Sequence, residues 1–152
     1  MPEVVSSFRI SIDQIEDYQF RVNFNREQLD PLIVDEPAPL GKETGPTATK
    51  LLASSVASCL CASLLFCANK SRLKVENIHA DVTVQTVRND KRKMRIGRIE
   101  VEINPGVEEA DRAKAQRCMD LFEEYCTVTQ SVRDGIEIAV NVKGFDREPV
   151  QL

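Results

Sequence analysis

Tryptophan is absent from the sequence, histidine occurs once, and aromatic residues make up only 5% of the 152 residues. Acidic residues outnumber basic ones, and the formal net charge is -4. Such a chain offers no basic stripe along which a phosphate backbone could lie. We therefore expect no nucleic-acid partner.

The sequence also lacks targeting signals and metal-ligand motifs. Its first residues, MPEVVSSFRISID, contain no basic segment followed by an apolar one, so we expect no secretory signal and a cytoplasmic location. The five cysteines are irregularly spaced, without a CxxC motif. This pattern predicts neither a disulfide framework nor a metal site, so the expected use of any functional cysteine is redox or nucleophilic chemistry.

The longest uncharged run, Leu51 to Ala68, holds three cysteines and four serines. Its composition predicts a central helix that protein surrounds on most sides. The helix is expected to begin after Gly45-Pro46-Thr47, where Thr47 or Thr49 can accept backbone N–H groups, and to end near Lys70. The run reaches the lower length limit of a membrane span, but its serines and cysteines and the flanking alternating segments favour a buried helix. We expect no membrane partner.

The rest of the chain alternates between strand and helix patterns. Segments of alternating apolar and polar side chains predict strands, and segments of helical periodicity predict two further helices. Prolines and glycines between Asp35 and Thr47 predict a structured surface loop. Strands are expected at 7–12, 19–24, 29–34, 78–87, 96–103 and 136–142, a turn at 13–17, and helices at 108–125 and 127–133.

This order of elements predicts a single α+β domain over residues 1–152, with a mainly antiparallel sheet and two long helices. Hydrophobic residues make up 42% and charged residues 29% of the chain, which is typical of a globular fold. One sheet face and one helix cannot cover a central helix that is apolar on nearly every side. We therefore expect a homodimer that buries this helix between two subunits.

Two cysteines differ from the others in their local setting. Cys59 lies within the apolar helix, on one stripe with Val56 and Phe66, so its thiol is expected to be sheltered. Cys126 stands where two predicted helices meet, and the free N–H groups of the second helix would favour a thiolate there. The alternative is that both are small core hydrophobes, as most free cysteines are. The other three cysteines are interpreted as core residues: Cys61, Cys67 and Cys118.

The run Gly45-Pro46-Thr47-Ala48-Thr49-Lys50-Leu51-Leu52, with Ala57-Ser58-Cys59 and much later Tyr125-Cys126-Thr127-Val128, resembles the OsmC/Ohr family of osmotically induced and organic-hydroperoxide-resistance proteins. The similarity covers most of the chain, from the proline loop to the final predicted strand. Its parts are a helix entry, a cysteine inside that helix and a second cysteine that opens a short helix. The ordered set is more specific than any part alone.

The resemblance implies an OsmC-like intertwined homodimer, with two central helices back to back and a thiol peroxidase site at the interface. In that family the first cysteine attacks the peroxide and the second resolves the product. Carried over to this chain, Cys59 would become a sulfenic acid and condense with Cys126 to a disulfide. The implied substrate is an organic hydroperoxide, the implied reductant an external lipoyl-type dithiol, and the implied role oxidative stress defence without a cofactor or metal.

The chain departs from the family pattern where the peroxidatic thiolate is activated. Active members typically place a glutamate in the helix-entry motif, and this chain has Thr49 at the matching position. In the family that glutamate orients an arginine from the N-terminal strands, for which Arg21 is the first candidate here and Arg26 the second. The alternative is that both arginines are solvated surface charges. Glu43 lies in the nearby loop, without a motif that assigns it the missing role.

Thr49 keeps a second interpretation open, in which the chain binds a small molecule on the same dimeric scaffold without turnover. A third interpretation assigns every cysteine to packing. Native-state thiol titration separates this third interpretation from the others, because all five thiols would then react slowly.

Overall fold

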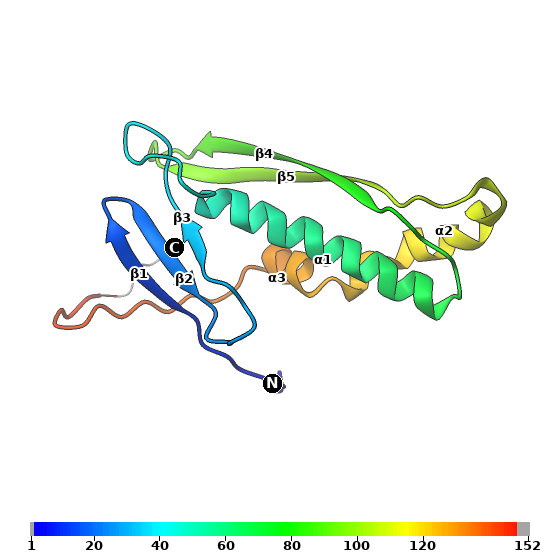
Figure 1. Cartoon of the computed structure of the whole chain (residues 1–152), viewed down its shortest axis with the longest axis horizontal. Coiled ribbons are helices and arrows are strands. Elements are labelled where there is room, and N and C mark those ends of the chain that lie inside the picture. Colours follow the sequence, from blue (N-terminus) through cyan, green and yellow to red (C-terminus); the bar gives the residue numbers. More distant parts are fainter. Residues whose placement is uncertain (1, 149–152) are drawn as a thin grey trace. The chain divides into compact units, whose positions relative to one another are not determined.

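The computed structural model describes residues 2–148, and contacts divide the chain into two compact units (Figure 1). The first comprises Met1–Ser58 and Ile78–Asn104, and the second comprises Cys59–Asn77 and Pro105–Leu152. The longest helix, α1 (Ala48–Lys70), contributes residues to both. The single domain over residues 1–152 stays a prediction.

Three short strands form an antiparallel sheet in the first unit, in the order β1-β2-β3. They span Ser11–Glu16 (β1), Gln19–Asn23 (β2) and Leu32–Val34 (β3). The predicted hairpin is confirmed, but β1 begins later than expected and runs through most of the predicted turn. The chain reverses over Asp17 and Tyr18 alone, because Asp17 adopts a left-handed conformation with φ 45°.

A longer hairpin in the same unit consists of β4 (His79–Arg88) and β5 (Met94–Asn104), which lie side by side in Figure 1. They pair antiparallel, with Ala80 opposite Ile103. The Oδ1 atom of Asn89 accepts two backbone N–H groups of the connecting turn, at 3.1 and 2.9 Å. These bonds fix the turn, and the antiparallel pairing of β4 with β5 confirms the second predicted hairpin.

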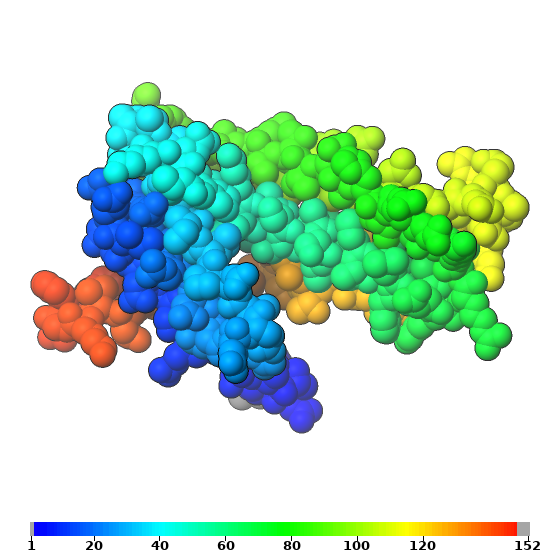
Figure 2. Space-filling view, in the orientation of Figure 1, coloured from blue at the N-terminus to red at the C-terminus, as the bar shows by residue number. Residues whose placement is uncertain are grey.

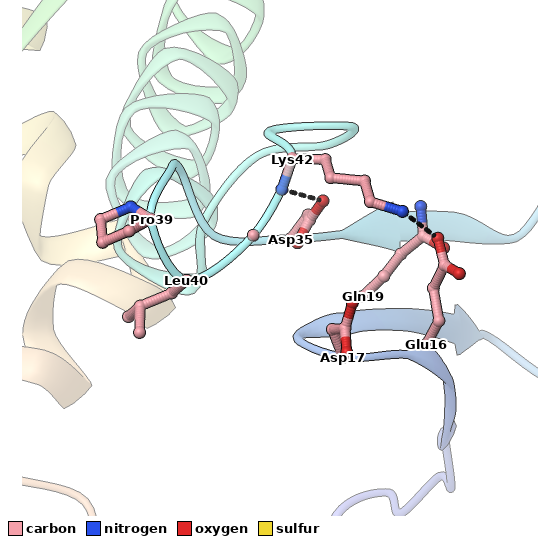
Figure 3. A pocket seen from close by; sticks show the side chains of 8 residues that line it. Glu16, Asp17, Gln19, Asp35, Pro39, Leu40 and Lys42 are labelled. Atoms are coloured by element: carbon pink, nitrogen blue, oxygen red, sulfur yellow. Dashed lines mark hydrogen bonds and ion pairs between the residues drawn. The ribbon is translucent and has the colours of Figure 1, made fainter.

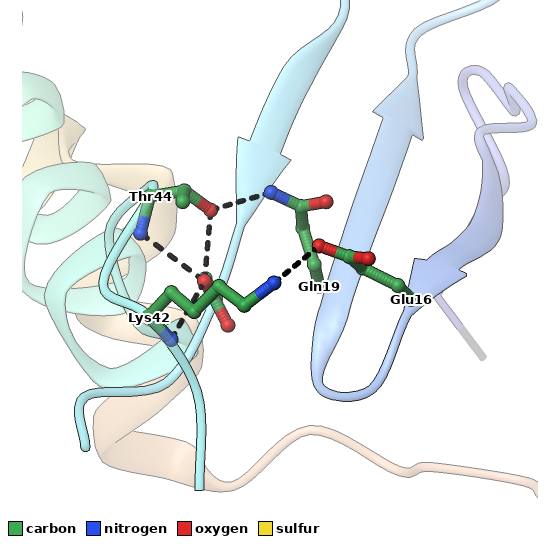
Figure 4. A network of polar contacts seen from close by, with 5 residues as sticks. Glu16, Gln19, Lys42 and Thr44 are labelled. Atoms are coloured by element: carbon green, nitrogen blue, oxygen red, sulfur yellow. Dashed lines mark hydrogen bonds and ion pairs between the residues drawn. The ribbon is translucent and has the colours of Figure 1, made fainter. Parts of the chain in front are cut away.

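One buried carboxylate organises the predicted loop between β3 and α1 (Figure 4). Asp35, only 2% exposed, accepts hydrogen bonds from the backbone N–H groups of Glu36 (2.8 Å), Lys42 (3.3 Å) and Thr44 (3.1 Å) and from the Thr44 hydroxyl (2.8 Å). The Thr44 hydroxyl and N–H hold the pKa of Asp35 below its ordinary value of 3.8, although burial opposes them. The Thr44 hydroxyl also accepts from Gln19 Nε2 at 2.6 Å, which ties the loop to β2.

A second contact ties the same loop to β1 (Figure 3). Lys42 Nζ lies 2.8 Å from Glu16 Oε1, and this ion pair raises the pKa of Lys42. Both side chains are more than half exposed, so the pair contributes little stability in comparison with the buried Asp35.

Helix α1 begins where the sequence predicts. Thr47 Oγ1 accepts the Lys50 N–H at 3.2 Å, so Thr47, rather than Thr49, caps the helix. The helix is long and apolar enough to cross a membrane by length and composition alone, and 44% of its most apolar window is buried within this chain. The buried core helix of a soluble protein meets the same criteria.

The second unit contains the C-terminal part of α1, two further helices and two short 3-10 turns. Helix α2 spans Arg112–Leu121 and helix α3 spans Thr127–Asp134. The prediction of one continuous helix over 108–125 is wrong, because 3-10 turns at Glu109–Asp111 and Phe122–Tyr125 flank α2. The second of these turns leads the chain into the extended conformation of Cys126, from which α3 starts.

The core of the second unit forms where α1 ends. The Leu73 N–H donates to the Ala68 carbonyl at 2.9 Å, and Arg72 takes a left-handed conformation with φ 52°, which stops the helix and turns the chain. Leu73 thereby packs with Ala68 and with Ala115 of α2. Three half-buried side chains cover this cluster: Val75, Val107 and Met119.

The last predicted strand, over 136–142, is not formed among the residues that the structure describes. Gly135 ends α3 with φ 77°, and the following segment has no strand assignment. Alternation marks a segment that can present one apolar face, but a strand also requires a hydrogen-bonded neighbour. The apolar side chains here are exposed, with Ile138 at 81%. The last described residues of the chain are the orange-red atoms at the left of Figure 2.

Candidate functional site

Cys126 occupies the N-cap of α3, at the junction where the sequence predicts a reactive thiol. Its Sγ accepts the backbone N–H of Thr129 at 3.4 Å and lies 3.0 Å from the Thr129 hydroxyl. Both side chains are buried, and Cys126 is 0% exposed. The thiol donates to the Thr129 hydroxyl, and a deprotonated sulfur at this position could accept from both the hydroxyl and the N–H of Thr129.

The pKa of Cys126 is lowered by its surroundings. Burial alone would raise this pKa, but hydrogen bonds from the Thr129 hydroxyl, the Thr129 N–H, Cys59 and Ser63 together outweigh it. A buried sulfur with several donors is one that can carry a negative charge. The site thus stabilises a thiolate at Cys126.

Cys59 and Ser63 reach this site from one face of α1. They are one helical turn apart, and the Ser63 hydroxyl donates to the Cys59 carbonyl at 2.8 Å. Ser63 is buried, whereas Cys59 is half-buried, so the predicted shelter of the Cys59 thiol is only partial within this chain. The structure therefore brings the two predicted functional cysteines together, with Cys59 the more accessible.

An apolar hollow of about 410 Å³ lies beside Cys59. The rings of Phe66 and Tyr125 pack edge to face, with 5.4 Å between their centroids. Lys70 Nζ lies 4.7 Å from the centroid of the Phe66 ring. The hollow is lined by Cys59, Ala62, Ser63, Phe66 and Tyr125.

Sequence reasoning found part of this lining and missed the rest. The predicted stripe placed Phe66 correctly, but Val56, on the same stripe, is buried instead of lining the hollow. Tyr125 of the lining was missed, as were the contributions of Ser63 and Thr129 to the setting of Cys126. Their signals are positional: Tyr125 precedes a candidate cysteine, and a hydroxyl three or four residues after each candidate cysteine lies on the same helical face.

The residues predicted to activate Cys59 belong to the first unit, whereas Cys59 belongs to the second. Arg21 lies on β2, opposite Asp13 in the β1–β2 register, and is exposed, as is Arg26. A role for Arg21 or Arg26 at Cys59 stays a prediction.

Glu43 interacts with the first turn of α1. Its Oε1 lies 3.7 Å from Lys50 Nζ, and both side chains are more than half exposed. Thr49, next to Lys50, is half-buried in the same turn. Thr49, which carries no charge, therefore occupies the position that the sequence resemblance assigns to the family glutamate.

The sequence predicts that the three remaining cysteines are core residues, and the structure buries two of them fully and one partly. Cys67 and Cys118 are buried, as predicted for core residues, and Cys61 is half-buried, with its pKa raised by burial. In addition, Cys67 and Cys118 touch each other, with 2.6 Å between their sulfur atoms. Within residues 2–148, no cluster of three or more histidine, cysteine or acidic side chains could hold a metal ion.

Comparisons with known proteins identify the family. The family model described as OsmC-like protein matches residues 41–141. No curated protein sequence matches the chain.

Solved structures share the fold at low sequence identity. An OsmC-like protein from Mycoplasma pneumoniae is 17% identical, with a TM-score of 0.67 over 86% of this chain and 89% of that one. An organic hydroperoxide resistance protein from Elizabethkingia anophelis is 17% identical (TM-score 0.65, 88% and 94% covered), and OhrB of Bacillus subtilis is 17% identical (TM-score 0.60, 83% and 91% covered). The α+β fold class is thereby confirmed, and the chain belongs to the family of OsmC-like proteins.

Proposed function

We propose that this protein is a thiol peroxidase that reduces organic hydroperoxides through Cys59 and Cys126. The observation that carries the proposal is the setting of Cys126: a buried sulfur whose pKa is lowered by Thr129, with further contributions from Cys59 and Ser63. An accessible thiol near a buried thiol with a lowered pKa suits peroxide reduction by disulfide formation.

In the first step, the Cys59 thiolate attacks the terminal oxygen of the hydroperoxide. The O–O bond breaks, the alkoxide takes a proton and leaves as an alcohol, and Cys59 becomes a sulfenic acid. In the second step, the Cys126 thiolate attacks the Cys59 sulfur, hydroxide leaves as water after protonation, and a disulfide forms. An external dithiol then reduces this disulfide by two exchange steps and becomes a disulfide itself.

The lowered pKa of Cys126 supports its part as the resolving thiol. The second step needs a thiolate when the sulfenic acid is present, and a lowered pKa raises the fraction of Cys126 that is deprotonated at a given pH. Cys59 is the better placed for the first step, because it opens onto the hollow whereas Cys126 is fully buried.

The hollow supports an organic hydroperoxide as the substrate. Ala62, Phe66 and Tyr125 present apolar surface next to Cys59, and an alkyl or aryl group would lose water contact there, whereas hydrogen peroxide has no such group. Two of the structures with this fold carry the name organic hydroperoxide resistance protein. We assign the protein on these grounds to oxidative stress defence, with a cytoplasmic location and a lipoyl-type dithiol as reductant.

The proposal includes a homodimer and an activating arginine. Exposed apolar side chains on α1, among them Leu65 at 40% and Phe66 at 47%, support the burial of this helix by a second subunit. Arg21 is the proposed partner of the Cys59 thiolate, with Arg26 as the alternative. Since Thr49 replaces the family glutamate, that arginine would lack its usual anchor.

Single-turnover reduction of cumene hydroperoxide tests the enzyme. Cys59→Ser should lose the reaction down to the rate of free thiol, because no sulfenic acid can form there. Cys126→Ser should consume one equivalent and stop, with a sulfenic-acid trap found on Cys59 by mass spectrometry. Cys61→Ala is the matched control on the same helix and should retain the wild-type rate. A wild-type rate no faster than free thiol would overturn the proposal.

Thr49 favours a second candidate function, a binding protein that uses the same hollow without turnover. Its half-buried, uncharged side chain cannot orient an arginine by an ion pair as the family glutamate does. Under this alternative, the reduced protein would bind a small aryl or alkyl compound but react with its hydroperoxide no faster than free thiol.

A further inference from the structure

We infer that Cys67 and Cys118 form a second oxidisable pair, distinct from Cys59 and Cys126, whose disulfide links the last turn of α1 to α2. The Cys67 and Cys118 sulfur atoms lie 2.6 Å apart, closer than two unbonded sulfur atoms usually approach, although the two residues are 51 positions apart in the chain. Neither residue lines the hollow beside Cys59. The inference does not depend on the proposed peroxidase activity.

The two sulfur atoms need little movement to bond. Disulfide formation requires side chains that bring their sulfur atoms together, and the separation of 2.6 Å is already close to bonding distance. The backbone on both sides is held by packing. Ala68 follows Cys67 and Ala115 lies one turn before Cys118, and both belong to the core cluster that joins α1 to α2.

The surroundings of the pair favour the thiol form of Cys67 over the thiolate. Cys118 is 0% exposed and Cys67 is 7% exposed, and the Ser71 hydroxyl lies 3.5 Å from Cys118 Sγ. Burial, together with the contact to Cys118, raises the pKa of Cys67 to about 11, so a thiolate is scarce at neutral pH. Reaction is therefore slow, and it selects an oxidant small enough to enter a packed core.

A small hydroperoxide meets these conditions. One thiol of the pair, deprotonated, attacks the peroxide oxygen, the O–O bond breaks, and the leaving oxygen departs as an alcohol or as water. The second thiol then attacks the resulting sulfenic acid and displaces water, so that the pair loses two electrons and two protons in total. In a reducing compartment this modification would mark exposure to peroxide, and a dithiol would reverse it slowly.

The consequence is a more stable second unit in the oxidised state. A bond between residues so distant in sequence removes conformations from the unfolded chain. For a native contact that needs little rearrangement, we expect the midpoint of thermal unfolding to rise by about 5–10 °C on oxidation. The change should disappear after reduction with dithiothreitol.

The test uses a full-length variant that retains only this pair, Cys59→Ser/Cys61→Ser/Cys126→Ser. It is treated with hydrogen peroxide, denatured in iodoacetamide, digested and analysed by mass spectrometry. We expect a peptide that links Cys67 to Cys118 within one chain, and a raised midpoint that returns to the reduced value with dithiothreitol. The matched control adds Cys118→Ala and should give no linked peptide and no reversible shift.

The wild-type protein provides a second measurement in case the triple variant does not fold. The same mapping should find the Cys67–Cys118 link alongside any link between Cys59 and Cys126. Full alkylation of Cys67 and Cys118 after peroxide treatment would overturn the inference, as would a link only between different chains. Because loss of peroxidase activity alone leaves both readouts unchanged, failure here is distinct from failure of the proposed function.

Discussion

At the scale of single residues, the environment of Cys126 decides what the site can do. The sequence places this cysteine before a short helix, and the structure adds the Thr129 hydroxyl and N–H as its principal donors. A cysteine in an apolar core would have a raised pKa, as Cys67 has. Burial acts to raise the pKa of both thiols, and the pKa of Cys126 is lowered because hydrogen bonding at its sulfur outweighs that effect.

Thr129→Val tests this explanation. The substitution keeps the shape of the side chain but removes the hydroxyl, which contributes the largest of the hydrogen bonds that lower the pKa of Cys126, so this pKa should rise. The measurement is the pH dependence of Cys126 alkylation, followed peptide by peptide in mass spectrometry. Thr127→Val, on the exposed first residue of α3, is the matched control and should leave the profile unchanged. An equal profile in both variants would contradict the assigned role of Thr129.

At the scale of elements, the loop between β3 and α1 depends on Asp35. A loop rich in proline and glycine is expected from the sequence, but its conformation comes from one carboxylate that accepts hydrogen bonds from three backbone N–H groups and one hydroxyl. The same loop ends at Thr47, whose side chain caps α1. The start of the central helix is thus positioned from outside the helix.

Asp35→Asn should lower the midpoint of thermal unfolding at neutral pH, because an amide N–H₂ cannot accept the hydrogen bonds that the carboxylate accepts. The pKa of Asp35 is lowered in the folded protein, so its stabilising contribution is complete above the ordinary value of 3.8 and is lost as the pH falls through the lower folded value. The difference between wild type and variant should therefore shrink at low pH.

Asp30→Asn, an exposed position just before β3, is the control for this experiment and should change the midpoint little at any pH. If the Asp35→Asn difference were constant from neutral pH down to about pH 2, a charge at Asp35 would not be the source of the effect.

At the scale of the whole molecule, apolar surface remains uncovered in the single chain. The segment that follows α3 exposes Ile136 at 62%, Ile138 at 81% and Val140 at 61%. A contiguous set of such side chains marks an interaction surface. We expect that a second copy of the chain covers it, in the homodimer proposed above.

Sedimentation or light scattering at micromolar concentration should therefore show a dimer. Ile138→Asp should weaken association at least about tenfold, because a charge would have to be buried in the interface. Asn141→Asp adds the same charge on the alternate face of the segment and is the matched control. A wild-type monomer, or equal dissociation of the two variants, would contradict this interface.

The sequence by itself determined several of the elements and the two candidate cysteines. Periodicity and capping are local properties, so α1, both hairpins, and Cys126 at the start of α3 could be predicted from neighbouring residues. The family resemblance added the pairing of Cys59 with Cys126. Only the tertiary structure decided which residues distant in the chain meet: Cys67 with Cys118, and Tyr125 with Phe66 beside the hollow. It also showed that alternation over 136–142 makes no strand within the described chain, because a strand needs a neighbour that no local pattern supplies.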